Sequence, residues 1–382
     1  MRILFVGMKY DYGKQERGYS FEYYNFFDPL LKMGHDILFF DFTGLLQQHG
    51  REWMNARLRE VVKVEKPDLL FSMIFEEELD PRNMRDISQA GDTITVNWFC
   101  DDHWRFDTFS RRWAPCFNWV VTTAQSALPK YARYRIRHVI KSQWACNHYL
   151  YTKQDLPLHH AVTFVGQPHG NRRETINALH DAGIEVQTWG LGWEKGRLAQ
   201  DEMIRCFNGS RINLNLANAS VAAPPTAENP YRRAVAGIIN STPLGRMVKN
   251  GIKGALAGLR NQPATQQAVS LPEQIKGRNF EVPGCGGFLL TSPVEDLERY
   301  YTPDKEICLF ADHRELVEKI HYYLNHEEER AAIAHAGHQR TLCEHTYVHR
   351  FSDIFRQVGL PYEDPAEIIS RGPQPGRMEE IR

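Results

Sequence analysis

Short apolar runs alternate with helical stretches along most of the chain, and this alternation limits the folds open to it. The first run, Ile3–Val6, is continuous, which is typical of a strand buried on both faces. A helical stretch at Phe21–Met33 follows, ended by Gly34, and the next run is Asp36–Phe40. Strands that alternate with helices predict a parallel sheet with helices on both faces.

The same pattern continues through the first half of the chain and then starts again. In the first half we predict a helix at Gln48–Glu65 and strands at Asp68–Met73 and Thr93–Phe99. In the second half the predicted elements are strands at Ala161–Val165, Ile184–Trp189, Arg211–Leu216 and Phe288–Thr291, and helices at Arg173–Ala182, Asp201–Phe207 and Arg314–Leu324. The expected fold is therefore α/β, with two Rossmann-like, doubly wound parallel-sheet domains facing across a cleft.

The expected domains are 1–155, 156–350 with an insertion at about 217–271, and a terminal helix and tail at 351–382. A chain of 382 residues, 42% of them hydrophobic, has enough apolar material for two cores. The last twenty or so residues are rich in proline and charge, so we expect them to be loosely ordered.

Charge and cysteine content narrow the class of protein. The formal net charge of −1 gives no global attraction to nucleic acid. Seven cysteines without a CxxC pair are typical of reduced thiols in a cytoplasmic protein. Residues 244–260 have a basic amphipathic pattern, which fits either peripheral contact with the inner membrane face or a helix packed on the core.

Glycine and arginine follow the first strand of the second half, in the sequence GQPHGNRR. Gly166 allows close approach to the backbone, whereas Arg172 and Arg173 begin a helix, where the macrodipole opposes cations. Cations in this position predict a bound anion nearby, such as a nucleoside diphosphate. Two exposed arginines on a surface helix are the plain alternative.

Acidic and imidazole groups follow the strand Thr93–Phe99, in the sequence CDDHWRF. Asp101, Asp102 and His103 are therefore candidate catalytic residues at the end of a strand, with an ordinary charged loop as the alternative. Neighbouring residues of an extended chain point to opposite faces, so the two aspartates are not expected to chelate one ion. We expect no metal and no other cofactor.

Two further loops carry candidate residues. Trp189 and Trp193 flank a GLGW turn and could stack on a base or sugar, although tryptophan is more often simply packed. The loop after the first strand contains Gly18 and Ser20, and Ser20 is expected to cap the following helix. This loop lacks GxGxxG, which argues against a dinucleotide oxidoreductase.

The C-terminal third carries a family resemblance, through the run QIKGRNFEVPGCGGFLLT and the later ERAAIAHAGHQRTLCEHTYVHR. These segments resemble the spore-maturation CgeB-like glycosyltransferases, relatives of the group 1 enzymes of GT-B fold. The resemblance covers most of the chain and is weakest between Ala217 and Leu271. It implies metal-independent, retaining transfer of a sugar from a nucleotide-sugar donor, with the acceptor on the N-terminal domain.

The resemblance also implies roles for individual residues. Lys276 and Arg278 match the family signature K.R.fE and are expected to bind the diphosphate or the sugar, and Glu281 is expected to accept hydrogen bonds from the ribose. Glu273 completes an E-x7-E pair, although the glycine after it stands one position later than in the family. A histidine follows the corresponding strand in many group 1 enzymes, as His103 does here, and the loop with Gly18 and Ser20 is expected to face the donor.

Other function classes remain open at this point. A non-catalytic module that binds nucleotide sugars or glycans would keep the segment Lys276–Glu281 but would not need Asp101–His103. An epimerase or a phosphorylase could also use two such domains. The expected partners are a nucleotide sugar and an acceptor that is a glycan, a protein, a lipid or a small molecule, with no nucleic acid.

Overall fold

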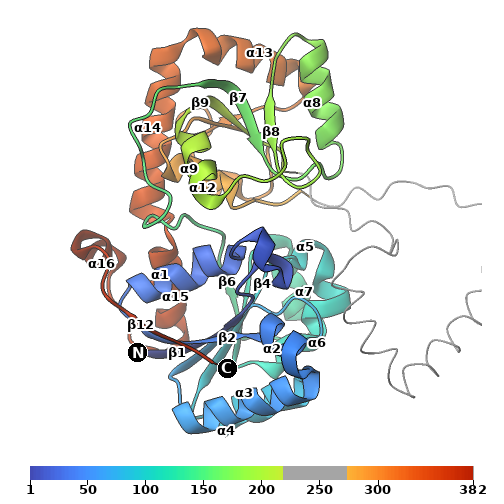
Figure 1. Cartoon of the computed structure of the whole chain (residues 1–382), viewed down its shortest axis with the longest axis vertical. Helices are drawn as coiled ribbons and strands as arrows, with labels where there is room; N and C mark the ends of the chain where they lie inside the picture. The colour runs from blue at the N-terminus through green and yellow to red at the C-terminus, as the bar shows by residue number, and fades with distance from the viewer. Residues whose placement is uncertain (218–272, 382) are drawn as a thin grey trace, which may run out of the picture. The chain divides into compact units, whose positions relative to one another are not determined.

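The computed structural model describes residues 1–217 and 273–381, which form two parallel β-sheets with helices on their faces (Figure 1). The insertion expected at about 217–271, apart from Ala217, lies outside the described residues, as does the amphipathic segment 244–260. None of the described helices is both long and apolar enough to cross a membrane.

The first sheet has seven strands in the order β12-β2-β1-β3-β4-β5-β6. Its strands are β1 (Arg2–Gly7), β2 (Asp36–Asp41), β3 (Leu69–Ser72), β4 (Ile94–Phe99), β5 (Trp119–Thr122), β6 (Val139–Lys141) and β12 (Arg377–Glu380). Ile3 and Phe5 of β1 enter one hydrophobic cluster, whereas Leu4 and Val6 enter another. Both faces of the sheet are thus buried, which is why this run is continuously apolar.

The second sheet has five strands in the order β11-β10-β9-β7-β8. Its strands are β7 (His160–Val165), β8 (Gln187–Trp189), β9 (Ser210–Asn215), β10 (Leu289–Thr291) and β11 (Cys308–Leu309). Every strand pair in both sheets is parallel. The two predicted doubly wound parallel sheets are therefore confirmed.

The helices cover both faces of each sheet. Those that follow strands of the first sheet are α1 (Asp28–Lys32), α2 (Phe42–His49), α3 (Arg51–Glu65), α4 (Pro81–Ala90), α5 (Asp102–Arg105), α6 (Arg111–Trp113) and α7 (Leu128–Arg133). Those of the second are α8 (Arg172–Asp181), α9 (Gln200–Asn208), α12 (Arg278–Gly284), α13 (His313–Asn325) and α14 (Glu327–Glu344). Then α15 (Tyr347–Val358) lies beside α1, and α16 (Pro365–Arg371) follows (Figure 1).

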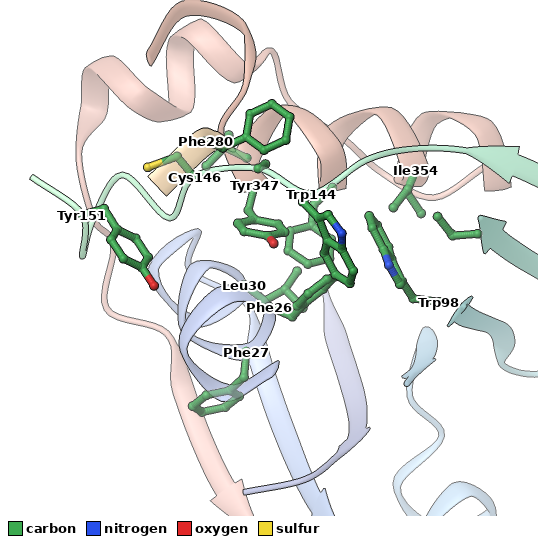
Figure 2. Packing of buried hydrophobic residues seen from close by; sticks show 14 of the residues in the cluster. Phe26, Phe27, Leu30, Trp98, Trp144, Cys146, Tyr151, Phe280, Tyr347 and Ile354 are labelled. Carbon is green, nitrogen blue, oxygen red and sulfur yellow. The ribbon is translucent and has the colours of Figure 1, made fainter. Parts of the chain in front are cut away.

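One hydrophobic cluster draws on residues from both halves of the chain (Figure 2). Phe26 meets Trp98 of β4 and Tyr347 of α15, with ring centroids 4.9 Å apart in each case. Phe280 of α12 and Tyr151, from the segment that joins the two sheets, belong to the same cluster. This core connects the linking segment and the returning helix α15 with the first sheet.

Several elements differ from those expected. The helix predicted at Gln48–Glu65 is two helices, because Gly50 separates them with a φ of 84° that favours glycine. A 3₁₀ turn at Leu297–Arg299 lies between β10 and β11 and was not among the predicted elements. Strands β5 and β6 were not predicted at all.

The prediction of a loosely ordered tail is wrong. Helix α16 and strand β12 occupy this region, and β12 pairs in parallel with β2 from Asp36 to Phe39. Glu380 forms an ion pair of 2.6 Å with Lys9, and Ile381 is 6% exposed within the core. Backbone pairing, this ion pair and one buried side chain hold a segment whose composition is typical of disorder.

Replacement of Ile381 by alanine is expected to lower the free energy of unfolding by about 2–4 kcal/mol, because it removes a buried side chain and leaves a cavity. Urea unfolding would measure the change. The control is Met378→Ala in the same segment, where the side chain is 47% exposed and an effect within about 0.5 kcal/mol is expected. Equal effects of the two changes would show that the tail does not dock as described.

Candidate functional site

Both sheets have a point where the strand order reverses, so that the connections leaving two neighbouring strands run in opposite directions along the sheet. In the second sheet this point lies between β7 and β9, and in the first it lies between β1 and β3. Ligands of such sheets bind beyond the carboxyl ends of these strands. The predicted donor residues lie at this position in the second sheet, and most of the predicted acceptor-side residues follow strands of the first.

Arg172 spans the carboxyl ends of β7 and β9. Its guanidinium donates to the carbonyl oxygen of Gln167 at 2.9 Å and to that of Leu216 at 2.5 Å. The side chain is only 6% exposed, and burial together with the charge of Arg278 lowers the pKa of Arg172 to about 10. Arg172 is thus a positioned buried cation rather than an exposed arginine on a surface helix.

The segment that begins α12 is held by a network of amides. The Asn215 side-chain amide donates to Asn279 Oδ1 at 3.1 Å and to Thr291 Oγ1 at 3.0 Å. Asn279 Oδ1 also accepts from the backbone N–H of Lys276 at 2.9 Å. All three of these side chains are buried, so β9 and β10 fix the place where Lys276 leaves the sheet.

Glu281 lies at the centre of a buried polar group. Its carboxylate is fully buried and accepts hydrogen bonds from Arg278 and, at 3.0 Å, from the hydroxyl of Tyr151. The Arg278 guanidinium also donates to the carbonyl oxygen of Val165 at 3.3 Å. Burial alone would lower the pKa of Arg278, but the negative charge of Glu281 and its hydrogen bond raise this pKa by more. The net effect is a raised pKa for Arg278.

Lys276 lies near both a positively charged and a negatively charged side chain. Burial and the charge of Arg172 lower the pKa of Lys276 to about 8, and Asp101 opposes this shift. The same two cations, Arg172 and Lys276, add to burial in lowering the pKa of His169, which lies in the turn after β7. Arg172, Lys276 and Arg278 thus share this end of the second sheet. Among the described residues, the ion pair found here is that of Arg278 with Glu281.

The segment after β4 brings two of its predicted residues toward Lys276. Asp101 accepts a hydrogen bond of 3.4 Å from the amide of Gln274, the second residue after the undescribed segment 218–272. Burial and the charge of Lys276 lower the pKa of His103 to about 4, so this imidazole is neutral at pH 7. His103 and Asp101 therefore lie within electrostatic reach of the predicted donor residues.

Asp102 is not placed with the other two residues. Its side chain is fully buried and accepts a hydrogen bond of 2.8 Å from the Tyr131 hydroxyl, on α7. Burial raises the pKa of Asp102 despite this and two further hydrogen bonds. The expectation that the two adjacent aspartates diverge agrees with the structure, and Asp102 has a structural place in the first domain.

The GLGW turn is closed by its own contacts. Trp193 donates its indole N–H to the carbonyl oxygen of Gly166 at 2.7 Å, and Arg173 lies 4.7 Å from the Trp193 ring centroid. A side chain at Gly190 would come within 2.3 Å of that same carbonyl oxygen, so this position needs glycine. Trp189 contacts Lys195, 5.0 Å from its ring centroid. These contacts favour packing for Trp193.

The first loop approaches the Lys276–Glu281 segment. Gly18 has a φ of 79°, and Ser20 accepts from the backbone N–H of Tyr23 at 3.0 Å, which is the expected capping contact. The next residue, Phe21, lies so close to Gly277 that a side chain there would come within 3.1 Å of its ring. Glu273, in contrast, is exposed.

Four residues of this region were not predicted from the sequence: Glu22, Tyr151, His169 and Gln274. Tyr151 and Gln274 carry no sequence signal, because their partners Glu281 and Asp101 lie more than a hundred residues away. His169 stands in the glycine-containing turn GQPHG, which was a usable signal. Within 1–217 and 273–381, no group of three or more His, Cys, Asp or Glu side chains is arranged to hold a metal ion.

Sequence comparison identifies one part of the chain. Residues 246–356 match the family described as Glycosyl transferase-like, which is less than a third of the chain and includes α12 and α14. No curated protein sequence matches.

Structural comparison extends over the whole described chain. HepE from Anabaena, in complex with UDP, is 12% identical with a TM-score of 0.59, covering 94% of this chain and 100% of that one. Sucrose-phosphate synthase from Thermosynechococcus elongatus is 10% identical with a TM-score of 0.58, covering 94% and 99%. A glycosyltransferase from Rickettsia africae is 10% identical with a TM-score of 0.56, covering 97% and 99%. The fold is therefore of GT-B type, and residues 246–356 are similar to the glycosyl transferase-like family.

Proposed function

We propose that the protein transfers a sugar from a nucleotide-sugar donor to an acceptor bound at the first sheet. The observation that carries this proposal is the group of three cations, Arg172, Lys276 and Arg278, at the strand-order reversal of the second sheet. Glu281 pairs with Arg278, and the Lys276 ammonium has no ion-pair partner among residues 1–217 and 273–381. A diphosphate would supply negative charge for Lys276, and its leaving-group charge would be stabilised there during transfer.

Several other residues of the site have a place in this proposal. Lys276 and Arg172 face the diphosphate, and Glu281, oriented by Tyr151, holds the guanidinium of Arg278 in place. Neutral His103 and Asp101 border the transferred sugar from the first sheet. The signature Lys276–Glu281 supports a place with the CgeB-like enzymes, and transfer is proposed to retain configuration and to need no metal.

The nucleotide of the donor is proposed to be UDP. HepE, with the same fold, has been crystallised with UDP and with UDP-glucose. Thermal-shift measurements with a panel of nucleoside diphosphates and nucleotide sugars test this, because a ligand that binds only the folded state raises its melting temperature. Release of UDP from UDP-glucose, with and without EDTA, then tests turnover; loss of turnover in EDTA contradicts the metal-independent mechanism.

The affinity for UDP is expected to fall as the pH rises through about 8. The charged form of Lys276 predominates below that pKa, and its deprotonation removes a charge-assisted hydrogen bond. Such a bond contributes about 1.5–3 kcal/mol, or roughly 10- to 100-fold in affinity. Calorimetric titrations between pH 6.5 and 10 would measure this, and Lys276→Met should bind weakly with little pH dependence. An equally flat profile in the unmodified protein would contradict the role of Lys276.

A further inference from the structure

Basic residues gather in one stretch of the first domain. Residues 108–140, which include α6, β5 and α7, contain six Arg and Lys and no Asp or Glu, in a chain whose formal net charge is −1. Two of the six are paired, Arg112 with Glu77 at 3.2 Å and Lys130 with Asp107 at 3.5 Å. Within the two described ranges no ion pair involves the other four, which are Arg111, Arg133, Arg135 and Arg137.

The turn after α7 directs two of these arginines outward. It is a Schellman motif, in which the backbone N–H of Ile136 donates to the Tyr131 carbonyl and that of Arg135 to the Ala132 carbonyl, each at 3.0 Å. Ile136 is 6% exposed and packs inward, so Arg135 and Arg137 on either side of it point to solvent. Arg135 has a φ of 59°, so a cation stands where this motif usually has glycine.

Tyr134 connects this turn to Arg111, which begins α6 beside α7 (Figure 1). The Arg111 guanidinium donates a hydrogen bond of 2.7 Å to the Tyr134 hydroxyl and lies 4.8 Å from the centroid of its ring. Tyr134 is 42% exposed, and Arg133 before it is exposed as well. Residues 133–137 span at most roughly 17 Å, so their charges can meet one surface. The arginine patch is defined here as Arg111, Arg133, Tyr134, Arg135 and Arg137.

Two kinds of anionic macromolecule have to be distinguished as partners, a nucleic acid and a membrane. Single-stranded nucleic acid stacks its bases on free aromatic rings, but Arg111 covers the Tyr134 ring and Phe106 lies 6.0 Å from it by ring centroids. Duplex DNA is read by a helix or a pair of strands placed in a groove, whereas Arg135 and Arg137 follow a helix of six residues. A membrane needs neither feature, only an exposed cluster of cations, so the patch favours a membrane.

We propose that the arginine patch docks the protein onto a membrane surface that contains anionic lipids. The planar guanidinium group binds phosphate through two parallel hydrogen bonds, which suits lipid headgroups. The negative potential of such a surface attracts basic side chains within a Debye length, which is about 8 Å at physiological ionic strength. Tyr134 adds a partly exposed amphipathic ring, a residue type that is enriched at membrane–water interfaces.

Cosedimentation with vesicles tests this docking on the unmodified protein. Vesicles of phosphatidylglycerol and phosphatidylcholine are compared with vesicles of phosphatidylcholine alone and with a DNA duplex. Each arginine is expected to contribute about fivefold to the partition coefficient, so the four together should favour the anionic vesicles by roughly 10²–10³-fold. The preference should vanish in about 1 M salt, where the Debye length is about 3 Å. Equal binding to both vesicles, no binding to the anionic ones, or tighter binding to the duplex would overturn the proposal.

A matched pair of triple variants assigns the docking to the patch. The first variant combines Arg133→Gln, Arg135→Gln and Arg137→Gln, and its partition coefficient should fall by about 100-fold. The control removes three exposed cations of α3 and α4 through Arg59→Gln, Lys63→Gln and Arg82→Gln. Both variants have the same net charge, yet the control should bind anionic vesicles nearly as well as the unmodified protein. Equal losses in the two, or binding that survives the first variant, would overturn the assignment to the patch.

A third variant separates loss of charge from loss of fold. It combines Arg133→Lys, Arg135→Lys and Arg137→Lys, which keep the positive charges and should keep most of the binding. A loss as large as that of the glutamine variant would contradict electrostatic docking. Vesicle binding is measured without a nucleotide sugar, so its outcome is independent of the proposed transferase activity, and absence of UDP release would leave the docking proposal standing.

Discussion

Replacement of Glu281 by alanine is expected to lower the free energy of unfolding by about 3–5 kcal/mol and to abolish binding of the donor. The change leaves the Arg278 guanidinium in the interior without its counter-charge, and removal of one partner of a buried pair has a cost of this size. It also leaves the hydroxyl of Tyr151 without its acceptor. Urea unfolding and titration with UDP measure the two effects.

Two controls separate charge from packing in this experiment. The double change Arg278→Met with Glu281→Leu removes both charges, so most of the stability is expected to return while binding of UDP does not. Asp353→Ala breaks an ion pair of the same i,i+3 spacing whose side chains are 59% and 40% exposed, and should cost less than about 1 kcal/mol. A loss for Glu281→Ala no larger than for Asp353→Ala would refute the buried pair.

Replacement of Lys276 by alanine is expected to lower kcat for sugar transfer by about 10²–10³-fold, the effect of removing one donor that stabilises charge in a transition state. No loss of stability is expected, because the Lys276 ammonium has no hydrogen-bond or ion-pair partner among the described residues and its burial disfavours its charge. Steady-state kinetics and urea unfolding on the same preparation give both values.

The control for this change is Lys63→Ala, an exposed lysine on α3, which should match the unmodified protein in both measurements. Lys276→Arg keeps the positive charge and is expected to recover part of the lost rate. Normal turnover in Lys276→Ala would remove Lys276 from the mechanism, and a large loss of stability would show that its role is structural.

The core strands could be predicted because a strand that is buried on both faces has a continuous run of apolar residues in the sequence. Ile3–Val6 and Ala161–Val165 are mainly apolar runs next to glycines, and both belong to interior strands with a neighbour on each side. Strand β12 has the sequence RMEE and all four residues are exposed, so no apolar pattern marks it. Its place is determined by backbone pairing with β2, which a sequence does not display.

The site was predicted in part for a similar reason. Lys276, Arg278 and Glu281 stand in one short motif, and Arg172 follows a strand and a glycine turn, so local sequence sufficed to find them. Asp101 and Asp102 are adjacent and chemically identical, and only packing against Tyr131 distinguishes the buried residue from the one that faces Gln274. Glu22 looks like an ordinary glutamate of a first helical turn until its neighbours from other loops are placed.

Strand β12 has a consequence for how the protein is made. Its partner β2 leaves the ribosome more than three hundred residues earlier, so the edge of the first sheet waits roughly 15–70 s at ordinary rates of translation. During that time β2 presents unpaired backbone groups, which are a template for wrong pairing with another nascent chain. Protection of this edge by a chaperone during synthesis would then matter more than for a fold whose sheet is completed in chain order.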